Sequence, residues 1–422
     1  MRQYLCIDLK SFYASVECVE KGLDPATTKL VVADPSRSSG TICLAISTAM
    51  KKEGVKNRCR LFEIPPDIEY IVATPRMELY MQKSAEIYGI YLKYIAKEDI
   101  HVYSIDEAFL DVTEYLSLYD MTARELGAAI IKDILDTLHL YATCGIGTNL
   151  YLAKIALDIM AKHSPDFIGE LTEESYKEEL WDHLPLKDFW RVGPGTVKRL
   201  ASRGILTMRD IACTDKKILY DLLGVDAEIL IDHANGIEPT TIADIKNYKA
   251  KTHSLSQGQV LPRNYNFEDG LLIVKEMVDL LCLDLVDKGL ITDTLSLTVG
   301  SDYKTGTRAS TSMKIKRATS SVRALTPYFE QMYKKLVPPD GEIRRLYIDF
   351  GNVTDEAYQQ YDLFSDPVEL EKDYKIQKSV NEIRKKFGNN AILRGMDLQD
   401  AATTKERNEQ IGGHSRGKSR ES

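Results

Sequence analysis

The alternation of apolar and polar positions predicts a mixed succession of strands and helices in roughly the first 165 residues. Apolar runs with a period of two alternate there with runs that repeat every three to four residues. The predicted strands cover residues 4–9, 30–33, 41–45 and 104–109. One predicted helix starts within residues 11–17, and three others cover 78–95, 123–138 and 150–162. A loop rich in turn-forming residues, 34–40, separates the second strand from the third.

The pattern changes near Leu184 to short helices, and changes again after an expected linker at 237–250. Beyond the linker, strands and helices follow in the order β-α-β-β-α-β, which predicts a split β-α-β sandwich. Its predicted strands are 254–260, 295–299, 310–315 and 344–350, and its predicted helices are 267–287 and 320–336. A charged amphipathic helix at 369–387 and a polar tail at 401–422, which we expect to be disordered, complete the chain. The predicted fold class is therefore α+β with several domains.

Composition narrows the class of protein without deciding its function. The chain has 422 residues, of which 44% are hydrophobic, enough for the cores of two to four domains. It begins with a charged strand-like segment, and no apolar stretch has the length of a membrane span, so we expect a cytoplasmic protein without a membrane segment. The seven cysteines form no Cys-x-x-Cys pair, which favours reduced packing thiols over a disulfide framework.

Three acidic residues in apolar, strand-like surroundings are the first candidates for chemistry. Asp8 lies in the run YLCIDL, and Asp106 and Glu107 lie in the run SIDEAF. Ionised carboxylates in such surroundings need compensating charge, and a shared pair of magnesium ions with oxygen ligands would supply it. Two metals about 4 Å apart stabilise the attacking and leaving oxygens in phosphoryl transfer. The alternative interpretation is that the acidic pair marks an exposed hairpin and Asp8 the end of a strand.

Asp106 and Glu107 are adjacent in the sequence, and this restricts the backbone conformation in which both could bind one metal site. Adjacent residues of a regular strand point to opposite faces, so Asp106 and Glu107 reach one metal site only near a turn, a bulge or a strand end. We therefore predict an irregularity at this position.

The net charge of the chain and the local distribution of its charges support opposite conclusions about a nucleic-acid partner. A net charge of -8 argues mildly against a nucleic-acid partner, because binding phosphates needs positive charge. The segment 301–325, however, carries six basic residues against one acid: Lys304, Arg308, Lys314, Lys316, Arg317 and Arg323. This basic patch falls on the middle two strands of the β-α-β-β-α-β run and their connection, where it would follow a nucleic-acid backbone. The alternative is a solvated strand face.

The sequence Gly193-Pro194-Gly195 resembles the turn of a helix-hairpin-helix. Such a turn lets the backbone N–H groups at a helix N-terminus approach a phosphate, and Lys198 and Arg199 follow where further phosphate contacts would form. The alternative is an ordinary Gly-Pro turn between two helices.

These motifs, in this order, resemble the Y-family translesion DNA polymerases over roughly residues 1–364. The resemblance rests on Asp8, the Phe12-Tyr13 pair, the run SIDE that ends at Glu107, the glycine turn at 193–195 and the β-α-β-β-α-β region. Within the family the chain is most similar to the UmuC-type polymerases of Gram-positive bacteria. The SIDEAF run combined with the amino-terminal Asp and the aromatic pair is the most specific part of the match.

The resemblance implies a right-hand polymerase architecture. It assigns residues 1–22 and 76–165 to a palm, 23–75 to small fingers and 166–236 to a helical thumb with the helix-hairpin-helix. It assigns 237–250 to a linker, 251–352 to a little-finger DNA-binding domain, and 353–422 to a clamp-binding peptide, a helix and a disordered tail.

The resemblance also implies roles for individual residues. Asp8, Asp106 and Glu107, with the backbone carbonyl of Leu9, would hold two magnesium ions. Tyr13 would be the steric gate that excludes the 2′-hydroxyl of a ribonucleotide, and Phe12 would support its ring. Without the family, the aromatic pair is interpreted as two core side chains at a helix start.

The triphosphate contacts depart from the family pattern. The usual Tyr and Arg fall at Thr48 and Lys51, and a lysine offers a point charge in place of the arginine fork. Lys162 matches the family's later phosphate-contacting lysine, although its spacing from Lys154 is one residue longer than is usual. The alternative for both lysines is a solvated helix face.

The segment 360–364 resembles the bacterial sliding-clamp-binding pentapeptide. Leu363 and Phe364 would be apolar anchors in a shallow groove on the clamp, and Gln360 a polar hook. The alternative is a loop that docks the two apolar residues on its own domain.

The function predicted is an error-prone, template-directed DNA polymerase that performs translesion synthesis in DNA repair and the SOS response by two-metal nucleotidyl transfer. Its expected partners are primer–template DNA, deoxynucleoside triphosphates and the sliding clamp, with possible accessory subunits and a monomeric state. A catalytically silent DNA-binding scaffold would not need all three acids with Tyr13. A nucleotidyl cyclase on a related palm would not need the hairpin, the basic patch or the clamp peptide.

Overall fold

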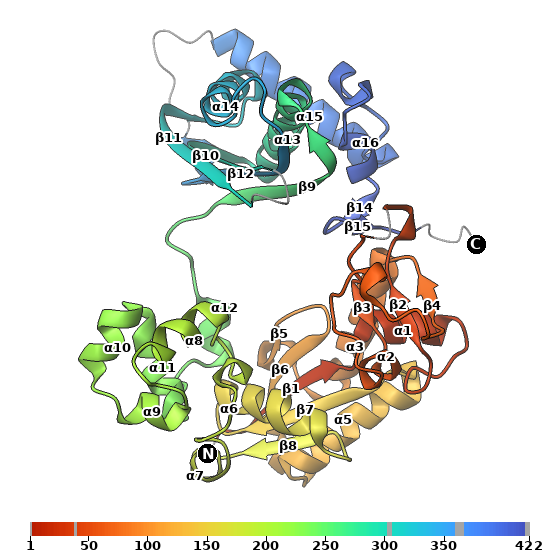
Figure 1. Ribbon diagram of the computed structural model, residues 1–422, viewed down its shortest axis with the longest axis vertical. Helices are drawn as coiled ribbons and strands as arrows, with labels where there is room; N and C mark the ends of the chain where they lie inside the picture. The colour runs from red at the N-terminus through yellow and green to blue at the C-terminus, as the bar shows by residue number, and fades with distance from the viewer. Residues whose placement is uncertain (1, 38–39, 302–305, 359–366, 418–422) are drawn as a thin grey trace. The chain divides into compact units, whose positions relative to one another are not determined.

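The computed structural model describes residues 2–37, 40–301, 306–358 and 367–417, and the chain divides into two compact units (Figure 1). The N-terminal unit comprises Met1–Tyr248 together with Gly417–Ser422, and the C-terminal unit comprises Lys249–Arg416. Each unit is built on its own β-sheet. Within the described residues, no helix is long and apolar enough to cross a membrane.

The sheet of the N-terminal unit has five strands in the order β5-β6-β1-β7-β8. The strand bounds are β1 Tyr4–Leu9, β5 Ile100–Val102, β6 Glu107–Asp111, β7 Ala142–Gly147 and β8 Ile168–Leu171. Strand β1 lies in the middle, antiparallel to both β6 and β7, and all its residues except Asp8 are buried. A strand covered on both faces needs the nearly continuous apolar sequence that β1 has. Its register places Asp8 directly opposite Glu107.

Two groups of helices cover the two faces of this sheet. Helix α5, Ala123–Leu138, packs on one face, where its Gly127 approaches the Cys144 side chain. A capping box between Thr122 and Glu125 starts α5, and His139 in the left-handed conformation ends it. Helix α3, Met77–Tyr94, packs against α5, and helix α1, Phe12–Glu20, follows β1 directly.

Helix α6, Leu150–Ile155, covers the other face and does not continue as the regular helix expected for 150–162. A π-helical segment, Ala156–Met160, and a 3-10 turn, Ala161–His163, follow it. The expectation of one amphipathic helix was wrong, because residues 150–157 are all buried and the segment carries one residue more than an α-helix accommodates at this spacing. A π turn takes up that residue without ending the helix.

Two glycines of β7 allow α6 to approach the sheet closely. A Cβ at Gly145 would lie 2.1 Å from the backbone oxygen of Ala153, and a Cβ at Gly147 would lie 2.2 Å from the Ala153 nitrogen. No side chain fits at either position.

A small three-stranded sheet, in the order β3-β2-β4, forms a second core within the unit. Its strands are β2 Leu30–Val32, β3 Ala45–Ile46 and β4 Ile71–Ala73, with helix α2, Thr48–Lys52, after β3. The expected strand at 41–45 is thus mostly absent. The chain first pairs with residues 59–61, through a single bridge between Ile42 and Arg60, and reaches β2 only at Leu44.

The rest of the N-terminal unit is helical. The helices are α4 Tyr115–Tyr119, α7 Glu173–Glu179, α8 Pro194–Ala201, α9 Met208–Cys213, α10 Lys216–Leu223, α11 Asp226–Ala234 and α12 Ile242–Asn247. The element before the Gly193-Pro194-Gly195 turn is a 3-10 turn, Leu186–Asp188, and the helix after it is α8. Helix α12 lies inside the interval 237–250 that was expected to be a linker, because Ile242 is buried against Tyr4 and Phe109.

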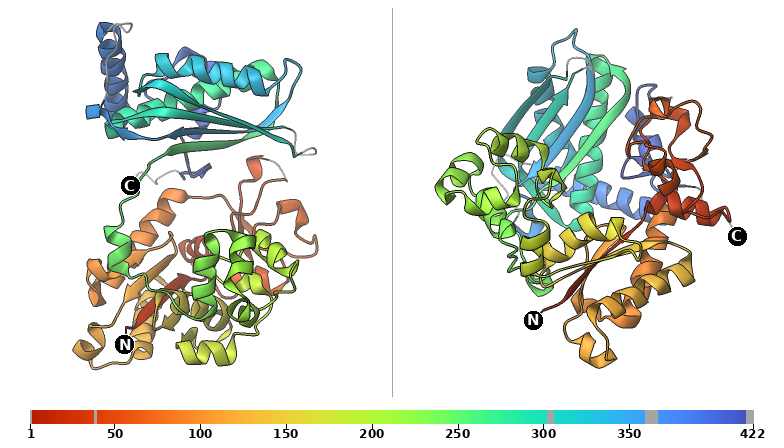
Figure 2. Two further views of the ribbon diagram at one scale, coloured as in Figure 1. Left: turned by 90° about the vertical axis from the view of Figure 1, so that its left-hand side faces the viewer. Right: turned by 60° about the horizontal axis from the view of Figure 1, so that its bottom comes forward.

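The C-terminal unit has the predicted β-α-β-β-α-β order. Its elements are β9 Leu255–Tyr265, α13 Phe267–Lys288, β10 Leu290–Gly300, β11 Arg308–Thr319, α14 Val322–Leu336 and β12 Ile343–Gly351. The sheet order is β11-β10-β12-β9 and all neighbours are antiparallel. One strand therefore separates each pair of strands that a helix connects, which confirms the split β-α-β prediction. Figure 2 shows α13 and α14 on the same face of this sheet.

The polar tail is ordered over residues 401–417, and the expectation of disorder there was wrong. Helix α15, Pro367–Phe387, packs on α13, and helix α16, Thr404–Arg407, and the hairpin of β14 Gln410–Ile411 and β15 His414–Ser415 follow. The short strand β13, Thr354–Asp355, pairs with β10.

The physical reason for this order is a pair of buried acids on α13. Glu276 accepts hydrogen bonds from the backbone N–H groups of Thr403 and Thr404, and Asp279 accepts one from Arg394 at 2.6 Å. The polar residues of the tail thus satisfy buried charges.

All seven cysteines are free, and all but Cys213 are buried. This agrees with the expectation of packing thiols.

We expect the Gly147→Ala variant to lose about 3 kcal/mol or more of stability, because its Cβ would overlap the α6 backbone. Gly89 lies inside α3, where an added Cβ would meet no atom within 4 Å, so Gly89→Ala should gain about 1 kcal/mol from helix propensity. Differential scanning calorimetry of both variants checks these opposite signs. An unchanged melting temperature of Gly147→Ala would contradict the close approach of α6 to β7.

Candidate active site

A tight hairpin between β5 and β6 places Asp106 and Glu107 beside the end of β1, which carries Asp8. The backbone N–H groups of Tyr103 and Ser104 both donate to the carbonyl of Glu107, at 2.9 and 3.0 Å, and the Leu9 N–H donates to the Asp106 carbonyl at 3.0 Å. Asp106 therefore lies in the turn, and the strand begins at Glu107 rather than at Ser104 as expected. The predicted irregularity is confirmed, and it is also the hairpin that the alternative interpretation required.

An alternating chain of charges joins two of the acids. Lys154 of α6 lies 2.8 Å from the Glu107 carboxylate and 3.0 Å from Asp158. Lys162 lies 2.7 Å from Asp158 and 3.2 Å from Asp8. The side chains of Lys154 and Glu107 are only 8% and 10% exposed, so this pair is formed away from bulk water.

Burial and the charged groups close to them shift the pKa values of Lys154 and Asp8. Burial opposes the charge of Lys154, but the adjacent Cys6, Glu107 and Asp158 outweigh it and raise the pKa of the ammonium group. Burial also raises the pKa of Asp8 to about 6; Lys162 counteracts this effect, and the charges of Asp106 and Glu107 add to it. A further positive charge near Asp8 would favour its ionised form.

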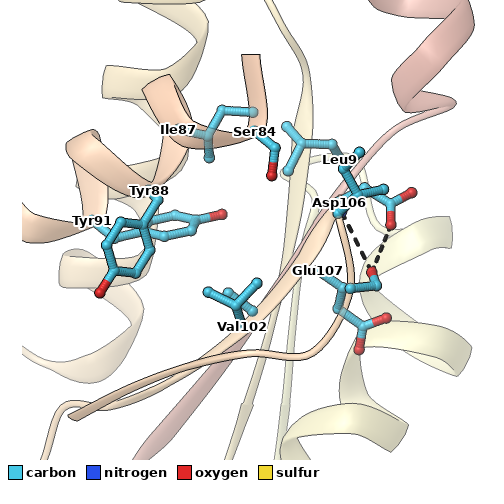
Figure 3. Close-up of a pocket in the computed structure, with 11 residues that line it drawn as sticks. Leu9, Ser84, Ile87, Tyr88, Tyr91, Val102, Asp106 and Glu107 are labelled. Carbon is cyan, nitrogen blue, oxygen red and sulfur yellow. Dashed lines mark hydrogen bonds between the residues drawn. The ribbon is translucent and has the colours of Figure 1, made fainter. Parts of the chain in front are cut away.

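The donor set suits magnesium in chemistry, since it consists of carboxylates and one backbone carbonyl. In the described part of the chain, however, no group of three acidic, histidine or cysteine side chains is gathered closely enough to hold one ion. Glu107 is turned toward Lys154, and Asp106 accepts a 2.7 Å hydrogen bond from the Ser104 hydroxyl. Figure 3 shows the carboxylates of Asp106 and Glu107 pointing in different directions.

A hollow of about 240 Å³, including its solvent-open part, lies between the hairpin and α3 (Figure 3). Tyr88 and Tyr91 line the α3 side, and Asp106 and Glu107 line the hairpin side. The acids thus border a space that is open to solvent on one side.

The aromatic pair lies at the start of α1. Phe12 is buried and Tyr13 is partly exposed, with their ring centres 5.6 Å apart. Burial and then the charge of Asp106 raise the pKa of Tyr13, so its hydroxyl lies within the electrostatic reach of the acids.

The support behind Tyr13 was not predicted from the sequence. The ring of Tyr80 stacks on it, with centres 4.6 Å apart and planes 24° from parallel. The Tyr80 hydroxyl donates to Glu17 at 2.8 Å, and Arg76 holds both oxygens of Glu17 at 2.9 and 2.8 Å. The signal in the sequence was Glu17 itself, an acid on the apolar face of α1 one turn after Tyr13.

The two triphosphate candidates of the small sheet lie in α2, whose N-terminus the Ser47 side chain caps. Thr48 is its first residue, and Lys51 is in its last turn. The surrounding protein withdraws water from Lys51 and lowers its pKa, while Asp8 raises it and Lys162 lowers it further. Lys162 also forms an ion pair with Asp8 at 3.2 Å.

The candidate DNA contacts of α8 are open to solvent. Gly193 precedes α8 and Gly195 lies in its first turn, and a Cβ added at either glycine would meet no atom within 4 Å. Lys198 is exposed, whereas Arg199 donates to the carbonyl of Leu222 at the end of α10.

Four residues of the basic patch, Arg308, Lys314, Lys316 and Arg317, lie on β11, which is an edge strand of the sheet in the C-terminal unit. Arg323 lies in α14, and Lys304 lies outside the described residues. Lys314 and Lys316 are exposed, and Lys314 pairs with Asp293 at 3.4 Å. Arg317 is only partly exposed. The clamp-binding candidates Gln360, Leu363 and Phe364 lie outside the described residues.

Two family models match the chain, one within the N-terminal unit and one within the C-terminal unit. The model of the impB/mucB/samB family matches residues 7–158, and the model of the C-terminal domain of that family matches residues 252–363. The chain belongs to the impB/mucB/samB family, the UmuC-type Y-family DNA polymerases. This confirms the resemblance drawn from the sequence.

Two relatives from Bacillus subtilis (strain 168) span nearly the whole chain of this Y-family polymerase. UvrX, a protein named for UV-damage repair, is 30% identical over 98% of this chain and 97% of its own. DNA polymerase IV 2 is 31% identical over 97% of both chains.

Solved structures agree with the fold. The Y-family DNA polymerase chimera Dbh-Dpo4(243-245)-Dbh has a TM-score of 0.66 at 22% identity, covering 84% of this chain and 99% of that chain. A Dbh ternary complex has a TM-score of 0.51 at the same identity and coverage. The Y-family polymerase thus has the expected multidomain α+β fold.

Proposed function

We propose that this polymerase extends a primer opposite damaged template bases by two-magnesium nucleotidyl transfer at Asp8, Asp106 and Glu107. The observation that carries the proposal is the position of Asp8 opposite Glu107 on neighbouring strands, with Asp106 in the adjoining turn beside Leu9. The names of the relatives, UV-damage repair and DNA polymerase IV, support the same activity.

The three acids and the Leu9 carbonyl would hold the two magnesium ions. Bound there, magnesium would lower the pKa of the primer 3′-hydroxyl and stabilise charge on the pyrophosphate that leaves. Lys154 pairs with Glu107 and fixes the position of its carboxylate. Lys162, which pairs with Asp8 and Asp158, would contribute positive charge to the triphosphate site.

Tyr13 is the proposed steric gate. A gate discriminates only if its ring resists displacement, and the stack with Tyr80, fixed in turn by the buried Glu17, provides that resistance. Phe12 supports the ring from the side of the core.

The proposed DNA contacts come from both units. The exposed N-terminus of α8, at Gly193 and Gly195, and Lys198 would bind phosphates of the duplex without reading its sequence. Lys314 and Lys316 on β11 would add charge from the C-terminal unit, with Arg199 and Arg317 in supporting positions.

We also propose a cytoplasmic monomer that binds the sliding clamp through Gln360, Leu363 and Phe364. The support is the sequence of the segment and its location between β12 and α15. The alternative to a polymerase is a catalytically silent DNA-binding scaffold of the same fold.

Primer extension on a template with an abasic site tests the activity. The wild-type chain, with magnesium and four deoxynucleotides, should extend past the site, and Asp106→Ala should lose at least about a thousandfold in rate because one metal ligand is gone. Tight primer–template binding without synthesis on undamaged DNA would favour the scaffold.

The Tyr13→Ala variant should incorporate ribonucleotides far more readily, because the space under the sugar then admits a 2′-hydroxyl. We expect the preference for deoxynucleotides to fall by at least about tenfold, a loss of ~1.4 kcal/mol in discrimination. Competition between matched ribo- and deoxynucleoside triphosphates measures it. Unchanged sugar discrimination would remove Tyr13 from this role.

Deletion of residues 360–364 should abolish stimulation of synthesis by the sliding clamp while leaving distributive synthesis largely intact. Primer extension with and without the loaded clamp measures both quantities. An equal loss of clamp-dependent and clamp-independent synthesis would show that the segment serves the fold instead.

A further inference from the structure

Two aromatic residues that the proposed function does not use connect the acidic hairpin to the helical part of the N-terminal unit. Tyr103 lies in the hairpin, three residues before Asp106, and its backbone N–H donates to the Glu107 carbonyl at 2.9 Å. Its hydroxyl accepts a 3.1 Å hydrogen bond from the indole N–H of Trp190. The two residues are 87 positions apart in the chain, so this bond joins separate parts of the unit.

The side chain of Tyr103 lies beside the groups that fix Glu107. Its ring is edge-on to Phe109 of β6, with centres 5.7 Å apart. The same ring lies 6.0 Å from the ammonium group of Lys154, which pairs with Glu107. Tyr103 is nevertheless 46% exposed, so burial alone does not set the direction of its side chain. The hydrogen bond from Trp190 therefore supplies a directional restraint on the turn.

Trp190 is held in place by the helical part of the unit. Its ring stacks on the buried His233 of α11, with centres 6.0 Å apart and planes 14° from parallel. The backbone turns tightly around it, since the Val192 N–H donates to the Phe189 carbonyl at 3.1 Å. Gly193, which precedes α8, follows Trp190 by three residues. The restraint on the hairpin thus comes from a residue next to the proposed duplex contact.

We propose that Trp190 and Tyr103 are positioning residues for nucleotidyl transfer. The indole N–H holds the Tyr103 hydroxyl, and with it the turn from which Asp106 and Glu107 bind their metals. The three-residue step from Trp190 to Gly193 connects the same turn to the duplex contact of α8. The inference rests on the proposed function and names residues that act through its metal ligands. The alternative is that the two rings only pack the helical part of the unit on the sheet.

Substitution by phenylalanine tests this role at each residue. Tyr103→Phe removes the hydroxyl and keeps the ring, and Trp190→Phe removes the indole N–H and keeps an aromatic side chain. The rate of single-nucleotide insertion is measured with saturating primer–template and deoxynucleotide at increasing magnesium concentration. We expect each variant to lose about tenfold in maximal rate and to need at least about threefold more magnesium for half of it, because misplaced ligands bind the metals less well. The Kd of Tyr103→Phe for primer–template should change less than about twofold.

The double variant isolates the bond between the two residues. If that bond carries the effect, Tyr103→Phe/Trp190→Phe should be no more than about twofold slower than the slower single variant, whereas independent losses would multiply to about a hundredfold. The melting temperature of Tyr103→Phe should fall by less than about 3 °C, because a solvent-exposed hydrogen bond contributes little to global stability.

Two control variants remove the same chemical groups elsewhere in the N-terminal unit. Trp181→Phe removes an indole N–H that donates to the Ala234 carbonyl at 2.6 Å. Tyr119→Phe removes a hydroxyl that donates to the Tyr94 carbonyl at 2.8 Å. Both variants should keep the insertion rate and the magnesium requirement of the wild type.

Tryptophan fluorescence gives a readout that does not depend on catalysis. The chain has two tryptophans, so Trp181→Phe leaves Trp190 as its only one. In that variant, magnesium added without nucleotide should change the emission of Trp190. Adding Tyr103→Phe should reduce this change by at least about half, because the indole then no longer contacts the hairpin through the hydroxyl.

The outcomes are distinct. An unchanged rate and magnesium requirement in Tyr103→Phe, losses that multiply in the double variant, or equal losses in the two controls would overturn the assignment and leave the proposed function in place. A wild-type chain that binds primer–template and inserts no nucleotide would overturn the proposed function, and this inference with it. Non-additive losses of rate with a raised magnesium requirement, absent from both controls, support the assignment.

Discussion

The enforced closeness of Asp8 and Glu107 is the constraint on which the rest of the N-terminal unit depends. The two acids face each other at the ends of β1 and β6 and are largely shielded from water, and unpaired carboxylates are costly in such surroundings. Ion pairs compensate the two carboxylates, through an alternating series of charges formed by Lys154, Asp158 and Lys162. These three residues all lie in the segment 150–163, which covers one face of the sheet. The packing of this segment on the sheet therefore also determines where the charges of the site lie.

The need to place Lys154 and Lys162 beside the acids explains two features of the chain whose role is not evident from the sequence. Gly145 and Gly147 let the backbone of α6 approach the sheet so closely that Lys154 reaches Glu107 while remaining buried. The π-helical segment then absorbs one extra residue, so that Lys162 still returns to Asp8 despite its longer spacing from Lys154. An irregular helix here preserves the contact that a regular helix of this sequence would have displaced.

Much of this could be predicted from the sequence, and the failures have physical causes. The strands around Asp8 and Glu107 and the β-α-β-β-α-β order follow from periodicity. An irregularity at Asp106-Glu107 follows from the requirement that two adjacent acids reach one site, although the requirement does not specify a hairpin. The π segment was not predictable, because apolar periodicity does not distinguish one extra residue from a longer helix. The tail was mistaken for a disordered segment, because its polar residues serve the buried Glu276, which sequence pattern places on the apolar face of α13 without showing its partner.

The proposed site would hold the two ends of a nucleotide by different physical means. Near the sugar, the ring of Tyr13 stacks on Tyr80, and Tyr80 is held by the buried carboxylate of Glu17, so a gate at Tyr13 would discriminate by a rigid shape. Near the phosphates, the proposed lysines would stand in place of the directional Tyr and Arg, and a point charge tolerates displacement of its anion better than a bidentate fork does. A polymerase that accepts distorted template bases would gain from this division, because the sugar would still be checked while the triphosphate would be held by charge that does not demand one exact pose.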